Sequence, residues 1–202
     1  KELNIKVEWV EEASWGTFQE GLNADRYDVM CTPVWEAGNR ATSALLTRAA
    51  FFNPMFAYIR KEDQQKFNTL EKLNAPGVKI ATYDGISESI RNIVFPKAES
   101  VPLPQFSDSS QALLSVSTKK ATAVFDNPSS IDLFNQKSDI PLVAVGQKPV
   151  RLFGNSFAVK LGEYSLKHML DTTIESLITS GEAESIIKKY PEFQAALPLY
   201  RE

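Results

Sequence analysis

Three polar residues of this sequence, Arg40, Ser87 and Asp126, have the types needed to hold both ends of a small zwitterion. A guanidinium can bind a carboxylate through two parallel hydrogen bonds. The free N–H groups at the start of a helix also favour an anion. An aspartate carboxylate can bind an ammonium group. Each residue falls in a stretch predicted to end a strand or to begin a helix, so we expect a site for an amino-acid-like molecule.

The helix-start part of this site lies in the turn Asp84-Gly85-Ile86-Ser87, between a predicted strand at 78–85 and a helix. In open α/β sheets, ligands bind beyond the carboxyl ends of strands. The backbone N–H groups of Gly85 and Ile86 and the hydroxyl of Ser87 are therefore candidate anion contacts. The alternative is that Ser87 only caps its helix.

The acidic part of the site is Asp126, which directly follows the apolar run Thr122 to Phe125. Asn127 as N-cap with Pro128 at the first helical position predicts a helix start there. Asp126 is then available to hold a cationic group, although a carboxylate at this position can also serve as the cap.

The cationic part is Arg40, in a loop predicted for 33–40 after the strand Tyr27 to Thr32. Trp35 in the same loop is a candidate for stacking on a ligand or for packing over the loop. Glu36 is a further candidate acid. The alternative for Arg40 is an exposed loop arginine.

Strands that alternate with helices predict an α/β fold with mostly parallel sheets and flanking helices. We expect one lobe from residues 1–57 and 156–202 and a second lobe from residues 61–152, with hinge strands near 55–60 and 153–160. A long amphipathic helix carrying Leu166 to Ile178 is predicted to end at Gly181. The remaining predicted strands are 5–10, 55–60, 141–146 and 153–160.

Composition excludes several functions. The net charge of -3 leaves no basic surface for nucleic acid, and no run of 18 apolar residues predicts a membrane span. Cys31, the single cysteine, is expected to be a buried small apolar residue, and with one histidine, His168, no Cys/His metal site can form. No nucleophile-elbow, P-loop, dinucleotide-binding or metalloprotease motif occurs, so we expect no catalytic residues, no metal and no cofactor.

In order along the chain, YDVMCTPVWEAGNR, KIATYDGISESI, TAVFDNPSS and the tail from FGNSFAVKLGE to IESLITSGEAESIIKKY resemble the amino-acid-type periplasmic solute-binding proteins of ABC importers, family 3 type. The resemblance implies a two-lobed periplasmic-binding-protein-like fold of type II. It also implies that Arg40 holds the ligand α-carboxylate, that Ser87 is a binding position and that Asp126 binds the α-ammonium. A monomer working with the membrane subunits of an ABC transporter is expected, in the periplasm or anchored outside the cell as a lipoprotein, with a signal peptide in the precursor.

The sequence also departs from that family pattern. The usual first strand and helix have no counterpart, so we expect an N-terminally incomplete first lobe. Trp35 stands where the family has Ser or Thr, Pro33 removes a nearby N–H, and Arg48 to Phe52 replaces an aspartate-proline-aromatic stretch. Two alternatives stay open: a cyclohexadienyl-dehydratase-like lyase with Glu36 as proton donor, and the ligand-binding domain of a membrane sensor or receptor.

Overall fold

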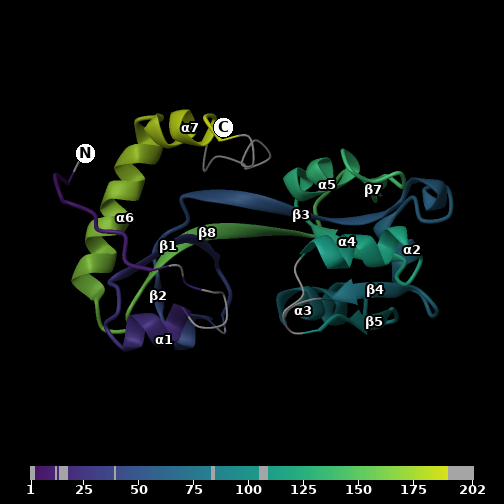
Figure 1. The fold of residues 1–202 in the computed structure, drawn as a ribbon, viewed down its shortest axis with the longest axis horizontal. Helices are drawn as coiled ribbons and strands as arrows, with labels where there is room; N and C mark the ends of the chain where they lie inside the picture. The colour runs from purple at the N-terminus through teal and green to yellow at the C-terminus, as the bar shows by residue number, and fades with distance from the viewer. Residues whose placement is uncertain are drawn as a thin grey trace. The chain divides into compact units, whose positions relative to one another are not determined.

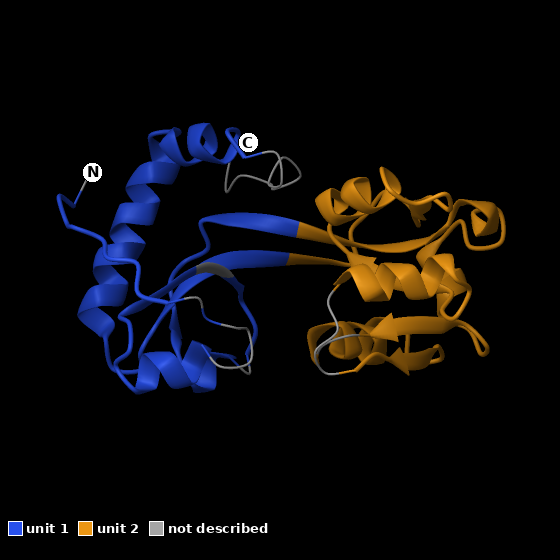
Figure 2. Ribbon diagram, viewed as in Figure 1, with its two compact units in different colours: residues 1–53, 153–190, 196–202 blue, residues 54–152, 191–195 orange. Residues whose placement is uncertain are grey.

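The computed structural model describes residues 3–11, 13, 18–38, 40–82, 85–104 and 109–190. The chain divides into two compact units (Figure 2). The described residues of unit 1 lie within Lys1–Asn53 and Phe153–Tyr190, and those of unit 2 within Pro54–Leu152. Each unit is described by itself below.

Unit 1 is built on strand β8 (Arg151–Val159), which pairs antiparallel with β1 (Val29–Trp35) and with β2 (Leu45–Leu46) (Figure 1). The helices of this unit are α1 (Phe18–Asn23), the 3-10 turn η1 (Arg40–Thr42), α6 (Tyr164–Thr179) and α7 (Glu182–Ile187). Gly181 separates α6 from α7 in the left-handed conformation, with φ of 78°, which glycine adopts without steric cost.

The core of unit 1 forms where α1 packs on β1. Phe18 and Leu22 are four residues apart and therefore share one face of α1. Both are fully buried against a cluster from the strands and the following loop, namely Met30, Val34, Ala44 and Ala158. The spacing of apolar residues in the sequence thus determines which face of this short helix is buried.

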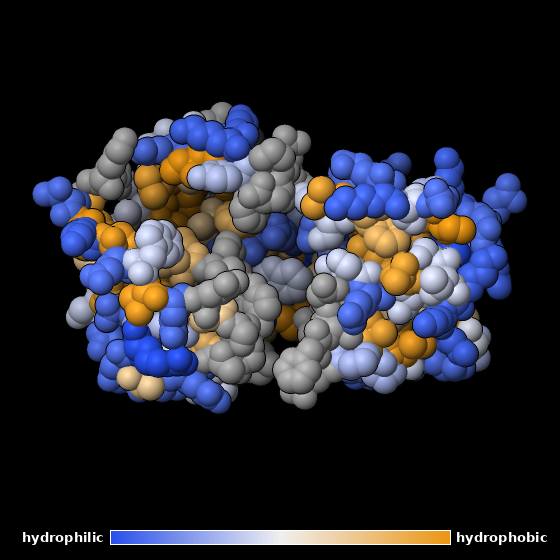
Figure 3. Space-filling view, viewed as in Figure 1, coloured by the Kyte–Doolittle hydropathy of each residue, from blue (hydrophilic) through white to orange (hydrophobic). Residues whose placement is uncertain are grey.

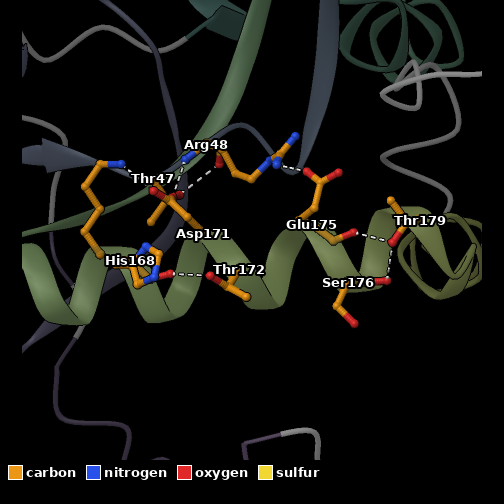
Figure 4. Close-up of polar contacts among 9 residues, drawn as sticks. Thr47, Arg48, His168, Asp171, Thr172, Glu175, Ser176 and Thr179 are labelled. Atoms are coloured by element: carbon orange, nitrogen blue, oxygen red, sulfur yellow. Dashed lines mark hydrogen bonds and ion pairs between the residues drawn. The ribbon is translucent and has the colours of Figure 1, made fainter.

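Polar contacts attach α6 to the segment that follows β2 (Figure 4). The backbone N–H of Arg48 donates to Oδ1 of Asp171 at 2.7 Å, and Oδ2 of the same carboxylate pairs with Lys167. The Arg48 guanidinium forms an ion pair with Glu175, one turn further along α6. Arg48 therefore has a structural role in the described part of unit 1.

Unit 2 contains the carboxyl-terminal part of β3 (Phe51–Arg60) and four further strands: β4 (Lys79–Thr82), β5 (Glu99–Pro102), β6 (Ala123–Asp126) and β7 (Leu142–Ala144). Its helices are the 3-10 turn η2 (Lys61–Asp63), α2 (Leu70–Leu73), α3 (Gly85–Val94), α4 (Ser109–Ser117) and α5 (Pro128–Asn135).

The strands of unit 2 are covered on both faces. Ala81 and Val124 point to one face, where they join a buried cluster with residues of α4 and α5, including Leu113 and Ile131. Phe125 points to the other face, because side chains alternate along a strand. Its ring stacks on Phe95, just after α3, with centroids 5.4 Å apart. Burial on both faces fits the apolar residues Ile80 and Ala81 of β4 and the apolar run Ala123 to Phe125 of β6.

The sheet is mixed, with strands in the order β1-β8-β3-β6-β4-β5. β4 pairs parallel with β5 and with β6. The pairs of β1 and β2 with β8, and of β6 and β7 with β3, are antiparallel. The prediction of mostly parallel sheets is therefore wrong in detail, because long β3 and β8 run against their neighbours.

Two local predictions are also wrong. Residues 4–11 form no strand, and Ile5, Val7 and Trp9 are exposed by 55%, 64% and 80%, because no described strand pairs with them. Cys31 is exposed rather than buried, because side chains alternate along a strand and its neighbour Met30 takes the face of β1 that α1 covers. The sequence also predicts a helix capped by Ser14 with Trp15 on its apolar face, and a capping box formed by Asp108 and Gln111. Ser14, Trp15 and Asp108 lie outside the described residues.

On the face of the protein drawn in Figure 3, the apolar residues of unit 2 are scattered among hydrophilic ones. The exposed apolar side chains of this unit include Ile93, Val94, Leu114, Leu133 and Ile140. Among the described residues, no helix combines the length and the apolar character needed to cross a bilayer.

Candidate functional site

Unit 1 brings the predicted residues Arg40 and Trp35 together. β1 continues through Trp35, so the predicted loop begins only after it, and Arg40 opens η1. Nη1 of the half-buried Arg40 donates a hydrogen bond to the carbonyl oxygen of Trp35 at 2.9 Å. The Trp35 ring stacks on the buried ring of Phe153, with centroids 4.5 Å apart and planes 11° from parallel. Both side chains are thus held in defined orientations.

The carboxylate of Glu36 is held beside these residues. Oγ of Ser156 donates a hydrogen bond to Oε1 of Glu36 at 2.9 Å, and the backbone N–H of Glu36 donates to the carbonyl oxygen of Gly154 at 3.0 Å. Gly154 leaves room for this carboxylate, because a Cβ at that position would lie 2.4 Å from Oε2. Glu36, which directly follows β1, is therefore held against β8 by these contacts. It contributes a negative charge next to the loop that carries Arg40.

In unit 2, the first turn of α3 contains Gly85, Ile86 and Ser87. Ser87 is 3% exposed and lies inside this turn, so the prediction that it is the N-cap is wrong. The first N–H groups of any helix have no acceptor within the helix. At Gly85, nothing lies within 4 Å of the position that a Cβ would occupy, so the backbone is open to approach there.

Asp126 ends β6, as predicted, and is 2% exposed. The helix cap is Asn127, whose side chain accepts from the N–H of Ser130, with Pro128 as the first helical residue. This geometry removes the reading of Asp126 as the cap of α5. Asn127 instead orients Asp126, because its backbone N–H donates to Oδ1 at 2.7 Å and its side-chain amide donates to the same oxygen at 3.2 Å.

The register of β4 and β6 places these two parts at one edge of the sheet. The strands are parallel, with Ile80 opposite Ala123 and Ala81 opposite Val124. This register carries Thr82 to the level of Phe125, so Asp126 lies one residue beyond the end of β4, and α3 starts three residues after Thr82. This is the edge of an open α/β sheet where ligands bind. Trp35, Glu36 and Arg40 belong to unit 1, whereas the first turn of α3 and Asp126 belong to unit 2.

A polar network next to the first turn of α3 was not predicted from the sequence. Oε2 of Glu88 accepts from Oγ of Ser100 at 2.6 Å, and its Oε1 pairs with Arg91. Oγ1 of Thr82 lies 3.0 Å from Oγ of Ser100. The network joins α3 to the ends of β4 and β5. The i,i+3 spacing of Glu88 and Arg91 was a visible signal, but Ser100 lies on a strand that was not predicted.

Two pKa values reflect this environment. Burial acts to raise the pKa of Glu88, but hydrogen bonds from Arg91, Ser100 and Thr82 and the charge of Arg91 outweigh it and lower that pKa. The pKa of the Tyr58 phenol is raised well above its usual range, first by burial and then by the negative charges of Asp126 and Asp132. The Asp126 carboxylate thus acts within a largely dry part of unit 2.

Within the described ranges, no group of three or more His, Cys, Asp or Glu side chains is placed to hold a metal ion. The described polar groups at the sheet edge and around Arg40 are hydrogen-bonding and charged groups suited to binding a small polar molecule. Residues 1–194 match the family described as bacterial extracellular solute-binding proteins, family 3, and the chain belongs to this family.

Solved structures agree with this fold. A protein described as a binding component of an ABC transporter from Wolinella succinogenes, complexed with lysine, has a TM-score of 0.78 at 14% identity and covers 94% of this chain and 80% of its own. The amino acid ABC transporter substrate-binding protein AbpA from Streptococcus pneumoniae, bound to L-arginine, has a TM-score of 0.71 at 18% identity, covering 92% and 76%.

An ancestral amino acid-binding protein described as a precursor of cyclohexadienyl dehydratase has a TM-score of 0.73 at 20% identity, covering 94% of this chain and 79% of its own. Among curated proteins, none matches the sequence of this chain closely enough to establish a relationship. At these identities the solved structures establish the fold alone.

Proposed function

We propose that this protein captures an amino acid or a related small zwitterion between two lobes and delivers it to the membrane subunits of an ABC importer. The observation that carries the proposal is the position of Asp126. Its carboxylate is 2% exposed and lies at the sheet edge where the first turn of α3 begins. Asn127 already donates two hydrogen bonds to this carboxylate, and a ligand ammonium group would add both a positive charge and further donors, which stabilise a buried carboxylate.

Each remaining part of the zwitterion has a partner in this proposal. Arg40 binds the carboxylate, with one donor already oriented by the Trp35 carbonyl. The first N–H groups of α3, at Gly85 and Ile86, together with Ser87, supply further donors for polar ligand atoms. Closure of the lobes about the strands near 55–60 and 153–160 excludes water and strengthens these ion pairs.

The family description and the ligands of similar structures support this function. The family is one of extracellular solute-binding proteins, which fits a site in the periplasm or on the outer face of a membrane. Two of the similar structures hold lysine and L-arginine. In this proposal the protein is a monomeric binder without a catalytic step. The lyase alternative would use the fixed carboxylate of Glu36 as an acid, and turnover of prephenate-like acids would distinguish it.

The test is binding of the twenty L-amino acids by isothermal titration calorimetry, with L-arginine and L-lysine first. For the tightest of them, Asp126→Asn, which keeps the shape and removes the charge, should weaken binding by about 2–5 kcal/mol, or roughly 30-fold or more. The methyl ester and the N-acetyl derivative of that amino acid should also bind weakly, because each lacks one charge.

The matched control is Asp132→Asn, the same change at an exposed aspartate of α5 in the same unit. It should leave the dissociation constant within about twofold, since an exposed charge is screened by solvent. Unchanged affinity in Asp126→Asn, or no binding of any L-amino acid by the wild-type protein, would contradict the proposed function.

A further inference from the structure

The strand register of unit 2 pairs Asp126 with an aromatic residue that the sequence did not single out. In the antiparallel pair of β3 and β6, Phe56 lies directly opposite Asp126. Directly opposed residues of an antiparallel pair point to the same face, with Cβ atoms about 4.5–5.5 Å apart. The ring of Phe56 and the carboxylate of Asp126 are therefore neighbours at the carboxyl end of β6.

The Phe56 ring is held in place but is not enclosed. It packs against the buried cluster of unit 2 as one of the partly buried members, with Leu103, Phe134 and Ala144. Its ring meets Tyr58 edge to face, with centroids 6.3 Å apart, and Tyr58 is only 4% exposed. A rigid neighbour of this kind limits the movement of Phe56, which is only partly buried.

We infer that Phe56 is a specificity-determining residue of the ligand site. The ligand ammonium group lies between the ring of Phe56 and the carboxylate of Asp126. This inference rests on the proposed function. An aromatic ring attracts a cation through its quadrupole, and the attraction is larger where water is excluded. The Asp126 carboxylate is 2% exposed and so provides such a place.

The pairing of Phe56 with Asp126 narrows the class of ligand that the site accepts. Asp126 alone requires a positive charge or a hydrogen-bond donor, and a neutral hydroxyl or amide would satisfy the second requirement. A ring beside the carboxylate favours a true cation over a neutral donor. The site is therefore selective for ligands with a charged amine, and 2-hydroxy acids of the same shape should be rejected more strongly than Asp126 alone would reject them.

The test measures the dissociation constants of the twenty L-amino acids, L-arginine and L-lysine first, and of the 2-hydroxy acid with the side chain of the tightest binder. Phe56→Leu should weaken binding of that amino acid by about 2- to 30-fold. Binding of the hydroxy acid should change less, so the ratio of the affinity for the amino acid to the affinity for the hydroxy acid should fall. Phenylalanine analogues with one, two and three ring fluorines at position 56 should weaken amino-acid binding step by step, because fluorine withdraws charge from the ring face while its shape is nearly kept.

Phe134→Leu is the matched control, since Phe134 is partly buried on the same cluster but comes from α5. It should lower stability without changing the ratio of amino acid to hydroxy acid. A flat fluorination series, or an unchanged ratio in Phe56→Leu, would overturn the inference. If Asp126→Asn still abolished binding in that case, the proposed function would stand and only the role of Phe56 would be lost. Failure of Asp126→Asn to weaken binding would remove both.

Discussion

Oγ of Ser156 donates a 2.9 Å hydrogen bond to Oε1 of Glu36, which joins the middle of β8 to the residue that follows β1. Gly154 makes this contact possible, because a Cβ there would lie 2.4 Å from Oε2 and 2.8 Å from Cδ of Glu36. The carboxylate thus fixes the start of the loop that leads from Trp35 to Arg40. The lack of a side chain at Gly154 thus helps to orient the loop that carries Arg40, a proposed ligand contact.

Gly154→Ala should displace the Glu36 carboxylate from Ser156. Loss of a hydrogen bond to a charged group costs about 1.5–3 kcal/mol, and chemical denaturation of the variant should show a loss of this order. In the background of Glu36→Ala, Gly154→Ala should cost much less unfolding free energy, because the carboxylate that it displaces is absent. The close neighbour that remains is Cβ of Ala49, 3.0 Å from the new Cβ. Equal costs in both backgrounds would show that the contact has no energetic weight.

Arg40→Ala should weaken binding of the tightest L-amino acid by about 2–5 kcal/mol, since its carboxylate would lose a guanidinium partner. Arg40→Lys should recover part of this loss, because an ammonium keeps the charge but lacks the planar pair of donors. Calorimetric titration measures both. Arg26→Ala is the control, because Arg26 is an exposed residue of unit 1 that pairs with Glu11. Wild-type affinity in Arg40→Ala would remove Arg40 from the site.

Glu88→Gln should destabilise the protein in a pH-dependent manner. The folded-state pKa of Glu88 lies below its ordinary value of 4.5, so the ionised form is favoured by folding. That contribution is present above the ordinary value and is lost as the pH falls through the lowered folded-state pKa. The difference in unfolding free energy between wild type and Glu88→Gln should therefore be constant near pH 7 and shrink below about pH 4.5.

Denaturant titrations at a series of pH values measure this difference. Glu99→Gln provides the comparison, because Glu99 is an exposed residue of β5 in the same unit. A surface substitution of this kind should change stability by no more than about 0.5 kcal/mol at any pH. A gap between wild type and Glu88→Gln that is as large at pH 3 as at pH 7 would contradict the role of ionised Glu88 in the network.

Much of the local structure follows directly from the sequence. The start of α5 at Asn127 and Pro128 is confirmed, because the cap is formed by residues within one turn of each other. The end of α6 at Gly181 is confirmed for the same reason, since the left-handed backbone is a property of that residue. Asp126 at the end of β6 and Arg40 at the start of η1 are likewise placed by short apolar runs and turns.

Other features were decided by tertiary structure. Residues 5–10 have the alternation of a strand but are not one, because a strand needs a partner for its backbone groups and pattern alone does not supply it. Cys31 lies in an apolar run and is exposed, because α1 covers the face of β1 that carries Met30 and the side chain of Cys31 alternates to the other face.

The contrast is clearest at the proposed ligand site. The sequence by itself determined which residues could do the chemistry, since a guanidinium, a helix start and a carboxylate are recognised by residue type and local spacing. Only the fold decided that Phe56 stands opposite Asp126 and that Ser156 and Gly154 hold Glu36. These pairs are 70 or more residues apart, and strand register, which brings them together, depends on burial across the whole sheet rather than on any local pattern.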